Sequence, residues 1–171
     1  MTKKIIIFYL FYVVVTLAHS KAQPSSTSNA PETNMNSKQV FSPVHCSINC
    51  ISNDQQMWVN ITFSNVMESS VTFLERNLVR TSDLTWSPFQ VSRNGQNVPY
   101  MGLTIKRPPP TASEFYHMKP HEVVNTRIEI GKFYDFSSSG NYVIKYIAVN
   151  PPFQTTSLFI VQSDPVIFKK R

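Results

Sequence analysis

Short apolar alternations, each bounded by turn residues, run along most of this chain and constrain its fold more than any other feature. From Met57 to Phe63 every second residue is apolar, as in a strand that buries one face. No segment keeps the 3.6-residue period of a helix over any comparable length. We therefore predict an all-β fold, a single antiparallel, immunoglobulin-like β-sandwich of about seven to nine strands. The expected strands are 44–50, 57–63, 70–75, 89–92, 98–100, 103–106, 123–130, 142–149 and 157–162.

The residues between these runs support the same fold. All four glycines lie there, and Asn94-Gly95 predicts a tight hairpin turn. One helix start stands out, because Thr111 and Glu114 have the spacing of a capping box and follow three prolines. This pattern predicts one short helical segment of one or two turns.

The beginning of the chain is expected to be an export signal. Lys3 and Lys4 precede an unbroken apolar run over residues 5–18, and small residues follow at Ser20 and Ala22. A secretory signal has this order, and the run is shorter than the ~20 residues that a membrane-spanning helix needs. We therefore predict a signal peptide over residues 1–22, no membrane span and a secreted, extracellular protein; an uncleaved signal anchor is the alternative that the short run disfavours.

Composition divides the rest of the chain. Residues 23–38 are polar and contain no aromatic or branched aliphatic side chain, so they cannot bury enough surface to become ordered. We expect a flexible linker there, the sandwich over residues 39–163, and a basic C-terminal tail over residues 164–171.

The charge of the chain argues against nucleic acid as a partner. The chain carries 16 basic and 10 acidic side chains, a formal net charge of +6. Three of the lysines lie in the expected signal peptide, and Lys169, Lys170 and Arg171 account for the remaining excess. A sandwich with no net charge and no basic stripe is a poor match for a phosphate backbone. We therefore expect no nucleic-acid binding.

One glycosylation sequon, Asn60-Ile61-Thr62, lies within the expected strand 57–63. Asn60 belongs to the set of alternate residues that would face solvent, where a glycan can be carried. We predict a glycoprotein modified at Asn60.

The sequence His121-Glu122-Val123-Val124-Asn125 begins like the zinc-protease motif H-E-x-x-H. That motif needs two histidines on one helical face to bind one zinc ion. Here Asn125 replaces the second histidine and the segment alternates as a strand, in which positions 121 and 125 would lie about 13 Å apart. His45 and His117 have no ligand-like partners in sequence. We therefore expect no metal site, no cofactor and no catalytic residue.

Two cysteines leave two alternatives. Cys46 and Cys50 alternate with polar residues in the expected strand 44–50, which would place their Cα atoms about 13 Å apart, beyond the ~7 Å limit of a disulfide. Buried thiols are the favoured reading. A disulfide would need a bend between the two residues, and an oxidising compartment favours one.

A denser signature over residues 84–147 resembles the N-terminal, non-catalytic β-sandwich of secreted deuterolysin-type and peptidyl-Lys metalloendopeptidases. The similarity extends over roughly residues 40–150 and consists of F-x-V, V-x-Y-x-G, K-R-x-x-P-T and Y-D-F-S-x-(S/T)-G-x-Y motifs. The central residues of these motifs, which we interpret as structural, are Tyr100, Gly102, Lys106, Arg107, Tyr134, Asp135, Gly140 and Tyr142; the others are Phe89, Val91, Val98, Pro110, Thr111, Phe136 and Ser137.

The expected activity depends on where this sequence differs from that family. Its catalytic half carries H-E-x-x-H and a downstream aspartate, whereas this chain ends about twenty residues after the last part of the resemblance. His121 stands where the family's P-G-E turn has glycine. The resemblance therefore implies a sandwich without the catalytic domain, and no metal ligand can be carried over.

Two functions remain. The first is a secreted, non-catalytic module that binds another extracellular protein, a peptidase among the candidates. The alternative is the detached accessory or prodomain-like half of a metallopeptidase whose catalytic chain is encoded elsewhere. Sandwich loops are natural contact surfaces, and we single out the segments 78–86 and 106–118. Trp86, Phe115 and Tyr116 are the candidate partner contacts, with a role as plugs of the core as the alternative.

Overall fold

The structure is a computed structural model, and it describes residues 41–53, 56–154 and 156–171. The expected signal peptide and linker lie outside the described residues. Within the described part of the chain, no helix is long and apolar enough to cross a membrane.

The described chain is built of strands joined by turns and by three single-turn 3-10 helices, so the all-β expectation is confirmed. The strands are β1 (Val44–Ser52), β2 (Met57–Asn65), β3 (Val71–Leu74), β4 (Phe89–Arg93), β5 (Gln96–Asn97), β6 (Phe115–Met118), β7 (Val123–Glu129), β8 (Gly140–Asn150), β9 (Phe159–Gln162) and β10 (Val166–Lys170). The 3-10 helices are η1 (Glu75–Leu78), η2 (Ala112–Glu114) and η3 (Ile130–Lys132).

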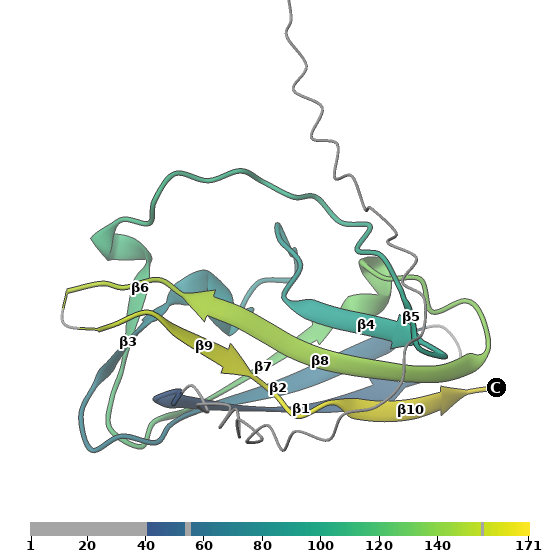
Figure 1. Cartoon of the computed structure of the whole chain (residues 1–171), viewed down its shortest axis with the longest axis horizontal. Helices are drawn as coiled ribbons and strands as arrows, with labels where there is room; N and C mark the ends of the chain where they lie inside the picture. The colour runs from purple at the N-terminus through teal and green to yellow at the C-terminus, as the bar shows by residue number, and fades with distance from the viewer. Residues whose placement is uncertain (1–40, 54–55, 155) are drawn as a thin grey trace, which may run out of the picture. The chain divides into compact units, whose positions relative to one another are not determined.

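Two antiparallel sheets form the sandwich (Figure 1). One has the order β1-β2-β7, and the other has the order β10-β8-β4-β5 with β9 also paired to β8. Along β2 the residues at odd positions from Met57 to Phe63 are buried and the intervening ones are partly exposed. This is the alternation that the sequence predicted.

The core lies between the two sheets. Phe63 of the first sheet meets Tyr146 of the second edge-on, with ring centroids 5.4 Å apart, and Phe73 of β3 lies 5.7 Å from Phe63. All three side chains are fully buried. Burial raises the pKa of Tyr146 well above its ordinary value, and its hydroxyl donates to the carbonyl of Asn77.

The second sheet continues beyond residue 163, which corrects the expected basic tail. Residues Val166–Lys170 form β10 along the same edge of β8 as β9. Between β9 and β10 the Ser163 hydroxyl accepts a hydrogen bond from the Tyr146 amide at 3.0 Å, where Pro165 has no amide to continue the ladder. The basic residues at its end predict a tail, but residues 166–170 alternate between partly buried and exposed around Phe168, as a strand does.

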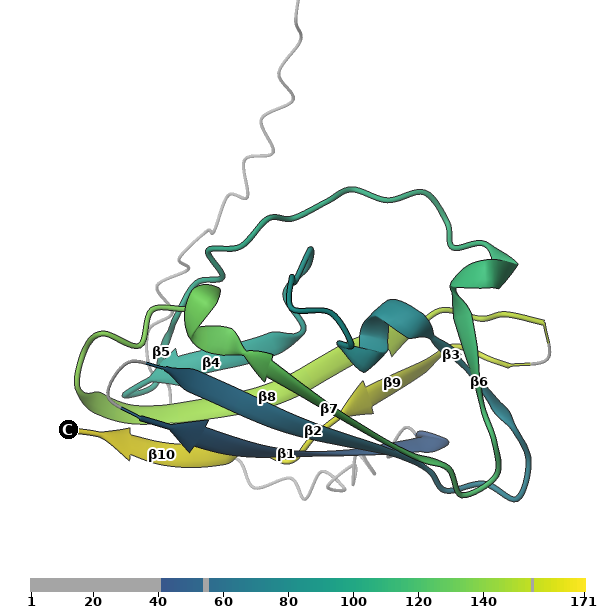
Figure 2. The ribbon, with the colours of Figure 1, turned by 180° about the vertical axis from the view of Figure 1, so that it is seen from behind.

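A separate two-stranded sheet, β3 with β6, stands at one end of the sandwich (Figure 2). Three asparagines, each 2% exposed or less, tie it to the rest of the fold. The Asn65 amide donates to the carbonyls of Met118 and Lys119. Asn150, at the end of β8, accepts from the Leu74 amide and donates to the Thr72 carbonyl, while Asn77 donates to the carbonyl of Val149. These contacts hold β3 and the η1 helix that follows it.

Two expected strands are wrong. Residue 100 makes only an isolated bridge to residue 134, and residues 103–106 pair with no strand. Residues 101–110 form an open arch that stands clear of the strands in both ribbon views (Figures 1 and 2). The three prolines at residues 108–110 lack amide donors, so the end of the arch cannot pair in a sheet.

Candidate functional site

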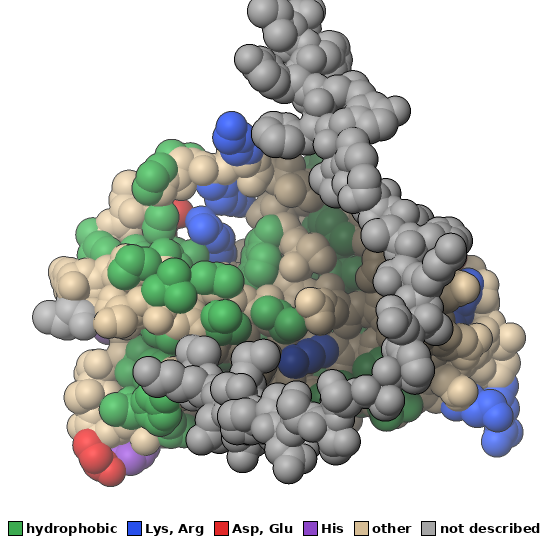
Figure 3. Space-filling view, viewed as in Figure 1, with side chains coloured by type: hydrophobic (Ala, Val, Ile, Leu, Met, Phe, Trp, Pro, Cys, Tyr) green, Lys and Arg blue, Asp and Glu red, His purple; other side chains and the backbone are tan. Residues whose placement is uncertain are grey.

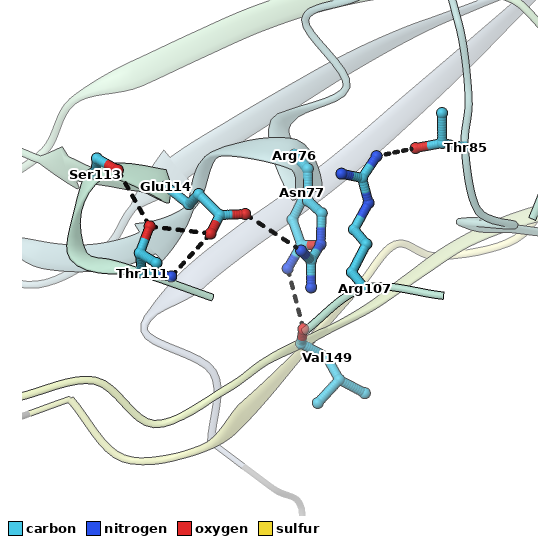
Figure 4. A network of polar contacts seen from close by, with 8 residues as sticks. All are labelled: Arg76, Asn77, Thr85, Arg107, Thr111, Ser113, Glu114 and Val149. Carbon is cyan, nitrogen blue, oxygen red and sulfur yellow. Dashed lines mark hydrogen bonds and ion pairs between the residues drawn. The ribbon is translucent and has the colours of Figure 1, made fainter. Parts of the chain in front are cut away.

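The two segments that the sequence singled out, 78–86 and 106–118, meet in space. Residues from both line a cleft of about 500 Å³, whose floor is the end of β3 and η1. Figure 4 shows Arg76 of η1 and Arg107 of the arch between Glu114 on one side and Thr85 on the other. The cleft is therefore the candidate functional site.

Arg76 contributes an incompletely paired guanidinium to this cleft. Its Nη1 is buried and has no hydrogen-bond partner among the described residues. The nearest carboxylate oxygen, Glu114 Oε1, lies 3.7 Å away, which is beyond hydrogen-bond length. Arg107 donates from Nη2 to the Thr85 hydroxyl at 2.7 Å.

Glu114 is fixed in place by the capping box that the sequence predicted. Its carboxylate accepts from the Thr111 amide at 2.8 Å and from the Thr111 hydroxyl at 3.1 Å. These bonds lower the pKa of Glu114, and Arg76 and Arg107 lower it further. The capping box opens only η2, a 3-10 helix, after which β6 begins. The expected helical segment of one or two turns is thus confirmed as a single 3-10 turn.

The three predicted aromatic contacts have different surroundings. Phe115 is 7% exposed and stacks on Phe153, with ring centroids 4.2 Å apart. It therefore packs inside the protein and is not available as a surface contact. Tyr116 is half-buried beneath the Arg80 guanidinium, 4.3 Å from the ring centroid, and its hydroxyl donates to Glu122. Trp86 is half-buried and lines the cleft.

The arch is fastened to the cleft at several points. The Tyr100 hydroxyl donates to the Leu84 carbonyl at 2.7 Å, and the Ile105 amide donates to the Thr85 carbonyl at 3.1 Å. Between these anchors the apolar side chains remain in solvent: Met101 is 58%, Leu103 75% and Ile105 47% exposed. Basic side chains gather along the arch, beside hydrophobic ones (Figure 3). The sequence predicts a strand over residues 103–106 from this alternation, but in the structure these residues lie exposed on the arch.

Gly102 allows the Tyr100 ring to lie against the arch. A Cβ atom at this position would lie 2.3 Å from Tyr100 Oη and 2.4 Å from Cζ, so the ring would have to move and release the Leu84 carbonyl. Gly102→Ala is therefore expected to lower the free energy of unfolding by about 2 kcal/mol, measured by urea denaturation. Gly131→Ala is the control, since its nearest neighbour would be the Met57 amide at 3.4 Å. Equal stabilities of the two variants would contradict this role for Gly102.

Four other motif residues, at positions 134, 135, 140 and 142, form a corner of the sandwich between η3 and β8. Tyr134 is buried, its hydroxyl donates to the Phe89 carbonyl at 2.8 Å, and burial raises its pKa to about 12. Asp135 accepts from the Ser137 amide, and the Tyr142 hydroxyl donates to the Ser138 carbonyl. This is a tyrosine-corner arrangement. Gly140 has φ +153° and passes close to the side chain of Arg93. Lys106 lies exposed on the arch.

Asn60 lies on the outward face of β2, half-buried, opposite Asn49 of β1 and Arg127 of β7. Its sequon partner Thr62 donates its hydroxyl to Asn125 Oδ1 at 2.8 Å. Glycosylation at Asn60 stays a prediction.

The three described histidines have different surroundings and no common partner. His121 is an exposed turn residue with φ +58°, and its Nε2 lies 2.9 Å from the Glu68 carboxylate. His117 Nδ1 lies 3.3 Å from the Thr72 hydroxyl, and His45 is exposed. Within the ranges that the structure describes, no three His, Cys, Asp or Glu residues are grouped as a metal site would require.

Both cysteines are free thiols on the regular strand β1. Cys46 is buried opposite Phe63, and Cys50 is half-buried opposite Val59. The strand has no bend between them, which a disulfide would have required. Burial raises the pKa of Cys46 to about 12 and that of Cys50 to about 11.

Slow alkylation of the native thiols is the expected consequence. Only the thiolate reacts, and the raised pKa values lower its population at pH 8 by about two to three orders of magnitude. Iodoacetamide should therefore label Cys50 before Cys46, and both far more slowly than in denaturant, as followed by mass spectrometry. Labelling at the denatured rate, or a mass two hydrogens lower, would contradict this arrangement.

Comparison with known proteins found a partial similarity to an extracellular protease. A scan against protein-family models found no match. The chain is 35% identical over 89 residues to an extracellular protease of Aeromonas hydrophila. The match covers 52% of this chain and 25% of that protein, so the chain spans about a quarter of the length of the relative it matches. The similarity indicates a protease-related module; it does not single out the deuterolysin type.

Proposed function

We propose that this protein is a secreted, non-catalytic module that binds another extracellular protein through the arch and the adjoining cleft. The observation that carries this proposal is the exposure of three apolar side chains, Met101, Leu103 and Ile105, on a segment anchored to Thr85 and Leu84.

The anchors matter because binding must overcome the entropy of ordering the contact residues. A segment already held by hydrogen bonds to the neighbouring loop has fewer conformations to lose. Beside these exposed apolar residues the cleft contains arginines and a tryptophan, which are residue types enriched in binding hot spots.

Site-specific photocrosslinking tests this proposal. A photoreactive residue in place of Leu103 should trap a partner from the native extracellular fluid, whereas one in place of Ile167 should not. Ile167 is the matched control, because it is 71% exposed on β10 at another part of the molecule. Leu103→Asp should abolish co-purification of the same partner, and Ile167→Asp should leave it intact. Equal trapping at both positions, or none at residue 103, would refute the arch as the contact surface.

The second candidate is the accessory half of a metallopeptidase whose catalytic chain is separate. It is favoured by the similarity to the Aeromonas protease over only part of that protein. In this case the partner trapped at residue 103 should be a chain that carries H-E-x-x-H. The purified protein alone should contain no stoichiometric zinc and should cleave no casein; chelator-sensitive cleavage by the isolated chain would overturn both candidates.

A further inference from the structure

We propose that the cleft binds an aspartate or glutamate side chain presented by an extended segment of the partner, through the guanidinium groups of Arg76 and Arg107. This inference rests on the proposed function and names the chemistry of the segment that the arch would hold.

The unused donors of the two arginines are the first argument. Each guanidinium has five N–H donors. Within the described ranges, Arg76 makes only the 3.7 Å ion pair with Glu114, and Arg107 uses one donor on Thr85. A charged donor such as Arg76 Nη1, buried without a hydrogen bond, is costly. The Arg76 side chain as a whole is 33% exposed, so an incoming carboxylate would bind its accessible donors and not the buried Nη1, and arginine binds carboxylates in a bidentate geometry.

The acidic residues of the cleft itself do not provide acceptors for these free arginine donors. The Glu114 oxygen that accepts hydrogen bonds is engaged by Thr111. Glu75 pairs with Arg80 at 3.5 Å, and Arg80 also lies over the Tyr116 ring. Asp83 is the remaining acid of the cleft, and it is exposed. The charged side chains that line the whole cleft are three arginines and three acids, so any attraction for an anion is local to Arg76 and Arg107.

The walls and the size of the cleft suit a side chain that has an aliphatic stem. Val79, Leu84 and Trp86 supply apolar surface beside the arginines. A volume of about 500 Å³ accommodates one such side chain together with part of its backbone. Because Thr85 contacts both Ile105 and Arg107, the exposed apolar edge of the arch leads directly to the charged end of the cleft.

A side chain, rather than a chain terminus, fits these donors. Carboxyl termini are captured mainly by nests of backbone N–H groups, whereas the donors here are two arginine side chains on separate segments. We therefore assign the cleft to an internal acidic residue that is flanked by apolar residues.

The two tryptophans make a direct test. Trp86 lines the cleft, while Trp58 lies under Arg127 on the first sheet, 4.5 Å from the ring centroid to the guanidinium carbon. The full chain labelled with ¹⁵N shows the indole N–H of each in one NMR spectrum. The probes are three hexapeptides with apolar flanks: a capped peptide with a central glutamate, its glutamine counterpart, and the glutamine peptide with a free C-terminal carboxylate.

The glutamate peptide should shift the Trp86 indole signal and leave that of Trp58 in place, at concentrations up to about 5 mM, which would largely occupy a site with a Kd of about 1 mM. Arg76→Gln and Arg107→Gln should each weaken this binding by about tenfold or more. Arg127→Gln, a matched loss of one guanidinium elsewhere, should not. Asp83→Asn should tighten it, because a like charge is removed. Thermal unfolding of each variant separates lost binding from lost folding, and Arg107, which is exposed, is the variant least able to disturb the fold.

The inference would be overturned by equal shifts from the glutamate and glutamine peptides, by a response limited to the free C-terminal carboxylate, or by equal losses from Arg107→Gln and Arg127→Gln. No glutamate-dependent shift at the highest concentration would overturn it as well. In each case photocrosslinking at residue 103 still reports on the proposed function, so failure of the carboxylate site and failure of the partner surface are distinguishable.

Discussion

Phe63→Ala should lower the free energy of unfolding by about 4 kcal/mol. Phe63 is fully buried between the sheets and contacts the rings of Tyr146 and Phe73. Its removal forfeits the buried aromatic surface and leaves a cavity that neighbours from two different sheets cannot close. Urea denaturation should show the loss directly, and the thermal midpoint should fall by roughly 15 °C.

A conservative replacement at the same site provides the control. Phe63→Leu keeps most of the apolar volume and should cost only about 1 kcal/mol. If alanine were tolerated as well as leucine, the contact between the two sheets at this position would not be a main source of stability.

Asn150→Ala should cost about 3 kcal/mol, a large loss for a polar side chain. Its amide accepts from the Leu74 amide at 2.7 Å and donates to the carbonyls of Thr72 and Pro151 at 3.2 and 3.3 Å. Since Asn150 is 0% exposed, water cannot take over these bonds, and each buried group left unpaired costs about 1 kcal/mol or more. Leu74 leads directly into η1, so the floor of the cleft should also loosen.

Two measurements check this prediction. Chemical denaturation gives the stability loss, and hydrogen exchange should show faster exchange of the Leu74 amide than in the unmodified protein. Asn141→Ala, an exposed asparagine on the same strand, should change stability by less than about 0.5 kcal/mol. Similar losses at both positions would show that Asn150 does not anchor β3.

Much of the fold could be predicted because, in each strand of a sandwich, apolar residues that face the core alternate with polar residues that face solvent. The alternation in β1, β2, β7 and β8 reflects one face against the core and one against solvent. The signal fails where exposure does not follow the alternation. Residues 101–105 alternate in polarity, yet they lie in solvent on the arch. The capping box of Thr111 and Glu114 predicts a helix, so the sequence gives no sign of β6, which begins directly after Glu114.

The candidate site was predictable only in part. The sequence indicated the two loops and predicted Trp86 as a candidate contact, whereas Arg107 stood out only as a structural residue of the family resemblance. It contained no signal for Arg76, because a single arginine beside a glutamate is typical of any solvated turn. Its significance arises from the position of Nη1, which is buried beside residues about forty positions away in the chain.

By itself, the sequence determined the fold class, the hairpin at Asn94-Gly95, where Arg93 of β4 pairs with Gln96 of β5, and the capping box. Periodicity, turn chemistry and caps depend on residues within a few positions of one another. Only the tertiary structure decided that η1, residues 78–86 and the arch enclose one cleft, that Asn150 holds β3, and that the last residues complete a sheet. These outcomes depend on contacts between distant segments, and the free energy of such contacts comes from burying surfaces together, which no local pattern records.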